Sequence, residues 1–171
     1  MDRNFLSYSI ATEWLQGVIG HDQFSMRAFA GGGRGRKGVD AERDWTSYDV
    51  FRKEREDPKH HVHGGPLPPG MYVCRYVSHH PKFHECIYLE QTITSIMAVD
   101  SNASVRFYGR GGFYIHGRGR HGSDGCIVPE DDLKRRHLNK AVKNASGTVL
   151  LEVKDVGMPL PASRNTSLMM A

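Results

Sequence analysis

A histidine and a cysteine ten residues apart carry the strongest chemical signal in this chain. His116 ends a short run of strand-forming residues, and Cys126 lies in a Ser-Asp-Gly-Cys turn that leads toward a helix. Thiolate chemistry needs a thiol at an accessible turn, a base to take its proton and N–H donors for the oxyanion. We predict Cys126 as the nucleophile and His116 as its base. The alternative is a buried structural thiol beside a loop histidine, because free cysteines are among the most buried residues.

The residues around this pair are candidates for shaping the site. Glycine lets the backbone approach a ligand closely and adopt positive φ, and four glycines lie between the histidine and the cysteine: 117, 119, 122 and 125. A Gly-Cys pair at a tight turn, here Gly125 and Cys126, can direct its backbone N–H groups at one point, as binding of an oxyanion requires. The predicted substrate-binding residues are Tyr114, Gly117, Arg118, Arg120, His121 and Asp124.

The elements that must position these residues are mostly strands. Apolar residues alternate with polar ones along 24–30, and partly over 4–19. Further segments rich in β-branched and aromatic residues predict strands at Met71–Val77, Glu85–Gln91, Ser104–Tyr108, Phe113–His116 and Thr148–Val153. The run 129–142 predicts one helix, with Pro129 first and Leu133, His137 and Ala141 on one face. The fold class is therefore mainly β (α+β) with one substantial helix after the cysteine.

Length and composition limit the remaining possibilities. The chain has 171 residues, which predicts a single domain over 1–157, with 1–30 as its least defined part, and a C-terminal tail over 158–171. No apolar run approaches the ~20 residues of a membrane helix. The net charge of +4 is mildly basic and selects no particular anionic partner. The first 20 residues resemble no secretory signal, so we expect synthesis in the cytoplasm without export by the general route.

The order His-Gly, then Ser-x-Gly-Cys-Ile, resembles the signature of the L,D-transpeptidase (YkuD-like) catalytic domain. The short His–Cys spacing is most similar to the small type VI secretion effectors of that family, which are antibacterial toxins. The glycine-rich segment 32–37 and the turn Gly65-Pro-Leu-Pro-Pro-Gly-Met-Tyr72 resemble elements of the same branch. The resemblance spans residues 30–155 and implies a YkuD-like β-sandwich.

The resemblance also implies an activity. Family members attack the carbonyl between the third residue of a peptidoglycan stem peptide, usually meso-diaminopimelate, and the terminal D-alanine. Water or an amine then resolves the acyl-enzyme, so the implied reactions are L,D-carboxypeptidase, D-amino-acid exchange or cross-linking. By position, the resemblance implies Cys126 as the nucleophile, His116 as the base, Ser123 and Gly125 as residues that shape the turn, and the N–H groups of Gly125 and Cys126 as the oxyanion donors. No cofactor is implied. The implied partners are peptidoglycan stem peptides, a type VI secretion apparatus and a periplasmic immunity protein, with action in the periplasm of a target cell.

The sequence departs from the family at Val128, where many wall-building members carry an arginine two residues after the cysteine. Arg118 and Arg120 are the candidates to bind substrate carboxylates instead, since a guanidinium binds carboxylate through two hydrogen bonds. The alternative for both is a solvated loop charge. His121 is an alternative base, and Asp124 either points away from the sulfur or caps the following helix.

Other motifs suggest functions that we set aside. Gly31–Gly38 resembles an RGG element, but it lacks interleaved aromatic residues, so we expect no nucleic-acid binding. Histidines 60, 61 and 63, and histidines 79, 80 and 84, lie in loop-like segments, which are poor metal sites. Cys74 and Cys86 are either a disulfide in an oxidising compartment or, as we favour, two buried thiols. The alternative to an enzyme is a catalytically inactive module that binds peptidoglycan or a protein partner.

Overall fold

The protein is described by a computed structural model over residues 4–31, 66–92, 112–117, 123 and 125–154. The elements are β1 (Phe5–Ser9), β2 (Trp14–Ile19), β3 (Asp22–Ala30), β4 (Gly70–His80), β5 (His84–Gln91), β6 (Phe113–Ile115), β7 (Ile127–Pro129), α4 (Asp132–Asn144) and β8 (Val149–Lys154). The mainly β fold with one substantial helix after Cys126 is confirmed for this part of the chain. The predicted strand at Ser104–Tyr108 and the predicted tail lie outside the described residues.

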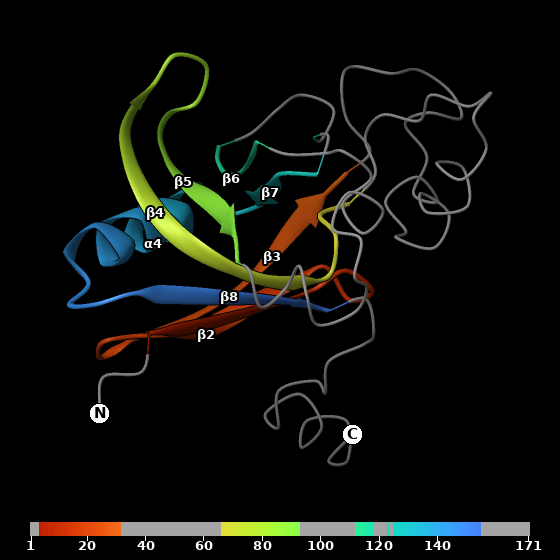
Figure 1. Cartoon of the computed structure of the whole chain (residues 1–171), viewed down its shortest axis with the longest axis horizontal. Helices are drawn as coiled ribbons and strands as arrows, with labels where there is room; N and C mark the ends of the chain where they lie inside the picture. Colours follow the sequence, from red (N-terminus) through yellow and green to blue (C-terminus); the bar gives the residue numbers. More distant parts are fainter. Residues whose placement is uncertain (1–3, 32–65, 93–111, 118–122, 124, 155–171) are drawn as a thin grey trace.

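The strands form one closed barrel in the order β1-β2-β3-β7-β6-β5-β4-β8 (Figure 1). Two neighbouring pairs are parallel, β6 with β7 and β1 with β8, and the other pairs are antiparallel. Because β8 pairs with both β4 and β1, the sheet has no open edge there, where a sandwich would leave two separate layers. The parallel pair β6–β7 brings the His116 and Cys126 segments together.

Alternating burial along the strands builds the core inside this barrel. In β3 the predicted apolar positions, Phe24, Met26, Ala28 and Ala30, are all buried and the intervening residues face outward. Strand β8 alternates in the same way, with Leu151 fully buried. Each large apolar side chain removed from water in this manner stabilises the fold by about 1.5–3 kcal/mol. The N-terminal strands are therefore an integral part of the barrel.

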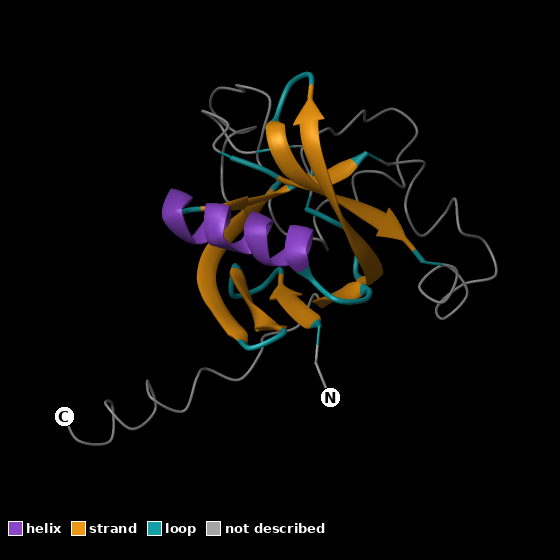
Figure 2. Ribbon diagram, turned by 90° about the vertical axis from the view of Figure 1, so that its left-hand side faces the viewer, coloured by secondary structure: helices purple, strands orange, loops and turns teal. Residues whose placement is uncertain are grey.

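Helix α4 packs its second half against the core and lies across the strands (Figure 2). Its buried residues are Leu138, Asn139, Ala141 and Val142. The predicted face was wrong in part, because Leu133 is 77% exposed. Pro129 was also predicted wrongly as the first helical residue. It ends β7 opposite Ala28, and Asp131 caps the helix by accepting a hydrogen bond from the backbone N–H of Lys134.

The Gly-Pro-rich turn before β4 is packed into the molecule. Leu67 is fully buried, and the Tyr72 hydroxyl donates to the carbonyl of Pro68 at 2.6 Å. Proline fixes φ, and this hydrogen bond secures the turn against the first residues of β4. Within the described ranges, no helix is long and apolar enough to cross a membrane.

Gly17 in β2 is a position where only glycine fits. A Cβ there would lie 2.2 Å from the carbonyl oxygen of Phe5, and φ is +152°. We expect Gly17→Ala to lower the free energy of unfolding by roughly 2–5 kcal/mol, because both backbone strain and overpacking arise. Gly20 is the matched control: φ is +61°, nothing lies within 4 Å, and Gly20→Ala adds only a strain of about 1 kcal/mol. Urea unfolding of both variants measures the difference, and equal losses would contradict the prediction.

Candidate active site

Cys126 lies in the turn that enters β7, with its sulfur against the backbone at the start of β6. The preceding residue, Gly125, has φ +120°, a conformation that side-chain-bearing residues rarely adopt. The backbone N–H of Tyr114 donates to Sγ at 3.4 Å, and the thiol donates weakly to the carbonyl of Gly112 at 3.8 Å. An N–H directed at sulfur favours its anionic form over the neutral thiol. The cysteine itself is only 8% exposed.

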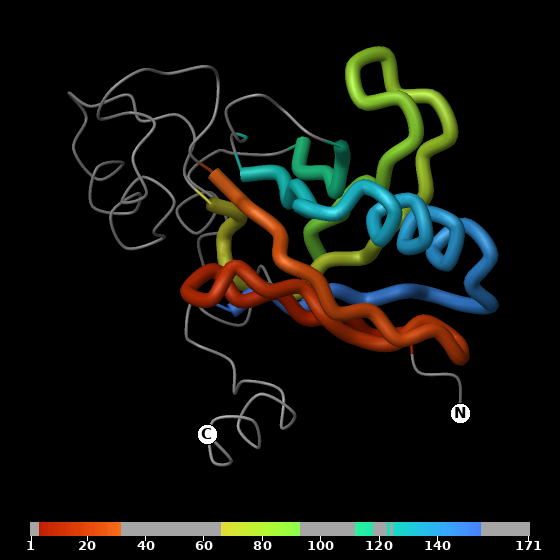
Figure 3. Tube along the Cα trace, turned by 180° about the vertical axis from the view of Figure 1, so that it is seen from behind, coloured from red at the N-terminus to blue at the C-terminus, as the bar shows by residue number. Residues whose placement is uncertain are grey.

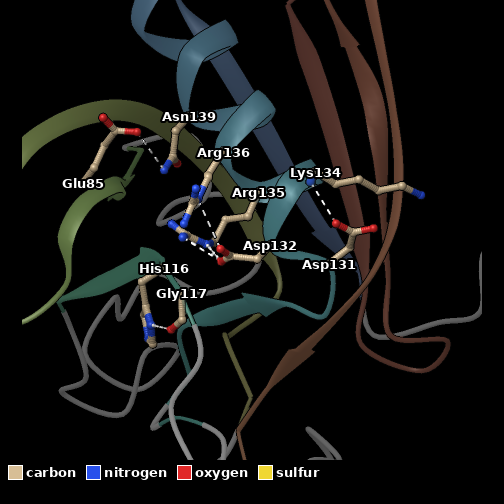
Figure 4. Close-up of polar contacts among 9 residues, drawn as sticks. All are labelled: Glu85, His116, Gly117, Asp131, Asp132, Lys134, Arg135, Arg136 and Asn139. Carbon is tan, nitrogen blue, oxygen red and sulfur yellow. Dashed lines mark hydrogen bonds and ion pairs between the residues drawn. The ribbon is translucent and has the colours of Figure 1, made fainter.

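His116 follows β6 and is tied to the residue after the cysteine. Its backbone N–H donates to the carbonyl of Ile127 at 3.1 Å, which continues the parallel pairing of Ile115 with Ile127. In the ring, Nδ1 lies 2.5 Å from the carbonyl oxygen of Gly117 (Figure 4). A carbonyl only accepts hydrogen bonds, so Nδ1 carries the proton and Nε2 keeps its lone pair. The ring is thus the tautomer that a general base requires.

The surroundings of His116 keep the imidazole neutral. Burial lowers the pKa of His116 below its ordinary 6.5, and the bond to Gly117 opposes this shift in part. The positive charges of Lys82 and Arg135 lower the pKa further, as does His80. A neutral imidazole near pH 7 is available to accept a proton.

Ser123 connects the turn of Cys126 to the end of β3. Its hydroxyl donates to the carbonyl of Cys126 at 2.5 Å and accepts from the N–H of Gly31 at 3.3 Å. Its own N–H donates to the carbonyl of Gly31 at 3.2 Å. Ser123 is 7% exposed, so these bonds are made away from water. The serine therefore positions the backbone of the cysteine.

Ser123→Ala is expected to lower the free energy of unfolding by about 1–3 kcal/mol, because the Cys126 carbonyl and the Gly31 N–H lose a buried partner. Any thiol-dependent activity should fall by more than the loss of folded protein explains. The matched control is Ser25→Ala, since Ser25 bonds Trp14 at the exposed surface, and we expect a change within about 0.5 kcal/mol. Urea unfolding and activity per folded molecule check both. Full activity per folded molecule in Ser123→Ala would refute the positioning role.

A second thiol lies beside His116. Strand β5 pairs with β6 through Ile87 and Ile115, and the same register places Cys86 opposite His116. Burial raises the pKa of the Cys86 thiol, Arg135 opposes this and Glu85 adds to it. Cys74 pairs with Leu89 and faces the core, and burial raises its pKa to about 12. Cys74 and Cys86 are both reduced and point to opposite faces of the sheet, so the disulfide alternative does not hold in this structure.

Arg135 of α4 packs over the Gly117 end of this segment. Its guanidinium donates to Asp132 Oδ1 through Nε and Nη2, at 2.9 and 2.7 Å, and its side chain is 13% exposed. Figure 4 shows this pair between α4 and the His116–Gly117 segment. A Cβ at Gly117 would approach the guanidinium carbon to 3.2 Å. Glycine at 117 thus leaves room for a buried cation beside the base.

The predicted site residues divide into those that the structure places and those that it does not describe. His116, Gly117, Ser123, Gly125 and Cys126 come together on the β6–β7 pair and its turn. Tyr114, on β6, is half-buried and contacts aromatic rings of β5 and of the β4–β5 turn. The other predicted substrate-binding positions, Arg118, Arg120, His121 and Asp124, lie outside the described residues. The oxyanion role of the Gly125 and Cys126 N–H groups stays a prediction.

Three residues near the base were missed by the sequence analysis: Phe83, Cys86 and Arg135. Each lies far along the chain from His116 and reaches it only through strand register or helix docking. A strand-like spacing around Cys86 was visible, but no local pattern gives the pairing partner. Of the histidines considered for metal binding, His80 accepts hydrogen bonds from the backbone N–H groups of Lys82 and Phe83, both at 3.1 Å. The group at 60–63 lies outside the described residues.

Comparisons with known proteins give structural likeness only. The chain matches no model of a known protein family and no curated protein. Among solved structures it is similar to an L,D-transpeptidase from Xylanimonas cellulosilytica, with 11% identity, a TM-score of 0.46 and coverage of 90% of this chain and 61% of that chain. It is also similar to L,D-transpeptidase 1 from Mycobacterium tuberculosis, with 15% identity, a TM-score of 0.41 and coverage of 89% of this chain and 62% of that chain.

The helical cell shape determining protein Pgp2 from Campylobacter jejuni gives 14% identity, a TM-score of 0.46 and coverage of 98% of this chain and 56% of that chain. This chain therefore spans about three fifths of the length of these proteins. At identities of 11–15% the likeness assigns no activity to this chain.

Proposed function

We propose that this protein is a peptidoglycan-acting cysteine L,D-transpeptidase or L,D-carboxypeptidase that cleaves the diaminopimelate–D-alanine bond of stem tetrapeptides. One observation carries the proposal: the paired strands β6 and β7 join a histidine in the base tautomer to the turn that holds a cysteine. The order of His116, Ser123, Gly125 and Cys126 agrees with the signature that the sequence resembles.

The proposed reaction has two halves. Nε2 of His116 takes the thiol proton of Cys126, and Sγ attacks the carbonyl carbon of the third stem residue. The oxyanion is held by the N–H groups of Gly125 and Cys126. When the tetrahedral intermediate collapses, the C–N bond breaks, His116 returns the proton to the amine of D-alanine, and a thioester remains. Water then releases a tripeptide, or the amine of a D-amino acid forms a new amide.

The described residues fit these steps through their contacts. The carbonyl of Gly117 orients the base and stabilises the imidazolium that forms after proton transfer. Ser123 fixes the carbonyl of Cys126 and thereby the turn whose N–H groups face the oxyanion. Arg118 and Arg120 remain the proposed ligands of the substrate carboxylates, and the contacts of Tyr114, His121 and Asp124 with substrate remain proposals as well.

Mass spectrometry of muropeptides tests the activity. A defined disaccharide-tetrapeptide is incubated with the protein, with and without D-methionine. We expect loss of D-alanine, giving the tripeptide, or replacement of D-alanine by D-methionine, and the ratio of products separates hydrolysis from exchange. A folded protein that leaves the tetrapeptide intact under both conditions would refute the proposal and favour a module that only binds peptidoglycan.

We further propose that the protein acts as an antibacterial effector of the type VI secretion kind, in the periplasm of a target cell. This rests on the resemblance of the segments 32–37 and 65–72, of which only the second lies partly within the described residues. A producing cell would need an immunity protein in its own periplasm. Expression in a bacterial host tests the proposal: we expect growth arrest only when a cleavable leader directs the protein to the periplasm. Equal growth with and without the leader would contradict it.

A further inference from the structure

The turn between β4 and β5 lies over the base of the site. Strands β4 and β5 form a long hairpin, which Figure 3 shows extending beyond the rest of the sheet. From its turn, the ring of Phe83 stacks on the imidazole of His116, with the ring centroids 3.9 Å apart and the planes 6° from parallel. One face of the imidazole is therefore covered by an aromatic ring from a distant segment.

The position of Phe83 is itself fixed by its neighbours. His80 accepts hydrogen bonds from the backbone N–H groups of Lys82 and Phe83 through Nδ1, which closes the turn. The His80 ring also stacks on Phe83, at 4.7 Å and 18°. Tyr114 closes the side of this stack, with its ring 4.8 Å from His80 and 5.5 Å from Phe83. The result is a three-ring stack of His80, Phe83 and His116.

Core packing does not account for Phe83. The residues around it in the turn, Pro81, Lys82 and His84, are exposed, and Phe83 is half-buried. Its ring lies against His116 and the rings of His80 and Tyr114, while Lys82 lies 5.4 Å above the Phe83 centroid. Phenylalanine neither donates nor accepts a proton, so it takes no direct part in proton transfer, and its closest ring contact is with the imidazole of His116.

We propose that Phe83 is a positioning residue for the general base, which fixes the plane of the His116 imidazole and excludes water from one of its faces. The bond from Nδ1 to Gly117 restrains the ring at one of its atoms, and the flat stack on Phe83 restrains the plane of the ring. Together the two contacts set the direction of the Nε2 lone pair. This role rests on the proposed function, because it requires His116 to act as the base.

The charged and titratable groups around the imidazole set the expected pH response. Lys82 and His80 belong to the hairpin turn, and Arg135 belongs to α4. Cys86 lies on β5 opposite His116, and Cys126 immediately precedes β7, which pairs with β6. Burial is the largest cause of the lowered pKa of His116. Removing the Phe83 ring exposes the imidazole, so its pKa should rise toward 6.5.

Four variants test the role of Phe83 in turnover: Phe83→Ala, Phe83→Leu, Phe83→Tyr and, as a control, Phe5→Leu on the exposed surface of β1. We expect Phe83→Ala and Phe83→Leu to lower kcat by roughly ten- to hundredfold with KM nearly unchanged, because misoriented bases lose such factors. Phe83→Tyr keeps a flat ring and should restore kcat, and Phe5→Leu should match the wild type. Wild-type kcat in Phe83→Leu would overturn the proposal.

A second measurement does not depend on turnover. The titration of His116 is followed by NMR in Cys126→Ala protein with labelled imidazoles, and its signal is identified by its loss in His116→Gln. We expect the midpoint to rise when Phe83→Ala is added, and to stay in place with Phe83→Tyr. An unchanged midpoint in Phe83→Ala would overturn the proposal. If the wild type proves inactive on muropeptides, the proposed function fails, and this titration alone decides whether Phe83 controls the imidazole.

Discussion

Replacing Cys126 with alanine is expected to abolish the release of D-alanine, with a fall in kcat of about four orders of magnitude or more. The physical reason is that the thioester needs a sulfur nucleophile at the turn, where Gly125 and the N–H of Tyr114 hold it. Side-chain volume changes little, so the variant should fold. Muropeptide mass spectrometry measures product, and circular dichroism with urea unfolding measures folding.

Cys86→Ala supplies the matched control for Cys126→Ala. The two thiols lie on either side of β6. Cys86 is on β5, which pairs with one edge of β6, and Cys126 precedes β7, which pairs with the other edge. Cys86 is fully buried, and burial raises the pKa of its thiol, which disfavours the thiolate. We therefore expect Cys86→Ala to keep the activity of the wild type. Activity that survives in Cys126→Ala and is lost in Cys86→Ala would show that Cys86, and not Cys126, is the nucleophile. That result would refute the proposed mechanism.

The strands with a clean period of two could be predicted from sequence. In β3 the apolar residues at 24, 26, 28 and 30 all face the core, as their alternation indicated. The helix was predicted to the right place but with the wrong start. Pro129 suits a first helical position, yet β3 is available to pair with it, and Glu130 donates to the Arg27 carbonyl. Tertiary pairing outweighed local propensity at this boundary.

The apolar face of α4 shows a similar limit. Leu133 continues an i, i+4 series with His137 and Ala141, but this series begins before the helix reaches the core. Leu133 remains exposed, and Leu138 and Val142 make the buried contacts instead. Spacing gives the candidate faces of a helix, whereas the docking against β4 and β5 decides which of them is buried.

In the candidate site, the reactive residues could be predicted from the sequence, whereas the residues that contact them became known only from the structure. The order of His116, Ser123 and Cys126 was readable because all three lie within one short segment. The contacts that tune them come from elsewhere: Gly31 at the end of β3 holds Ser123, and Phe83 from the hairpin turn covers His116. Such contacts depend on strand register across the barrel, and no local spacing encodes that register.

Replacing His116 with glutamine is the second test with a large expected effect. Glutamine is polar and of similar size, but its amide cannot accept the thiol proton and later return it. We expect kcat/KM to fall by about 10²–10⁴, the usual contribution of a general base. The acidic limb of the wild-type pH–rate profile should disappear with the group that titrates there. A variant that keeps both the rate and the limb would exclude His116 as the base and leave His121 as the alternative.

The same variant is expected to change how stability depends on pH. The pKa of His116 is lowered in the folded protein, so the unfolded chain binds more protons between that pKa and 6.5. The contribution of His116 to the free energy of unfolding of the wild type should therefore be fully present above about pH 6.5. It should be lost as the pH decreases through this window. His116→Gln removes this contribution, so the difference in unfolding free energy between the two proteins should itself vary with pH. Urea unfolding from about pH 5 to pH 7.5 measures it. A difference that is constant across this range would show that folding leaves the His116 pKa unchanged, and would contradict its lowering by burial.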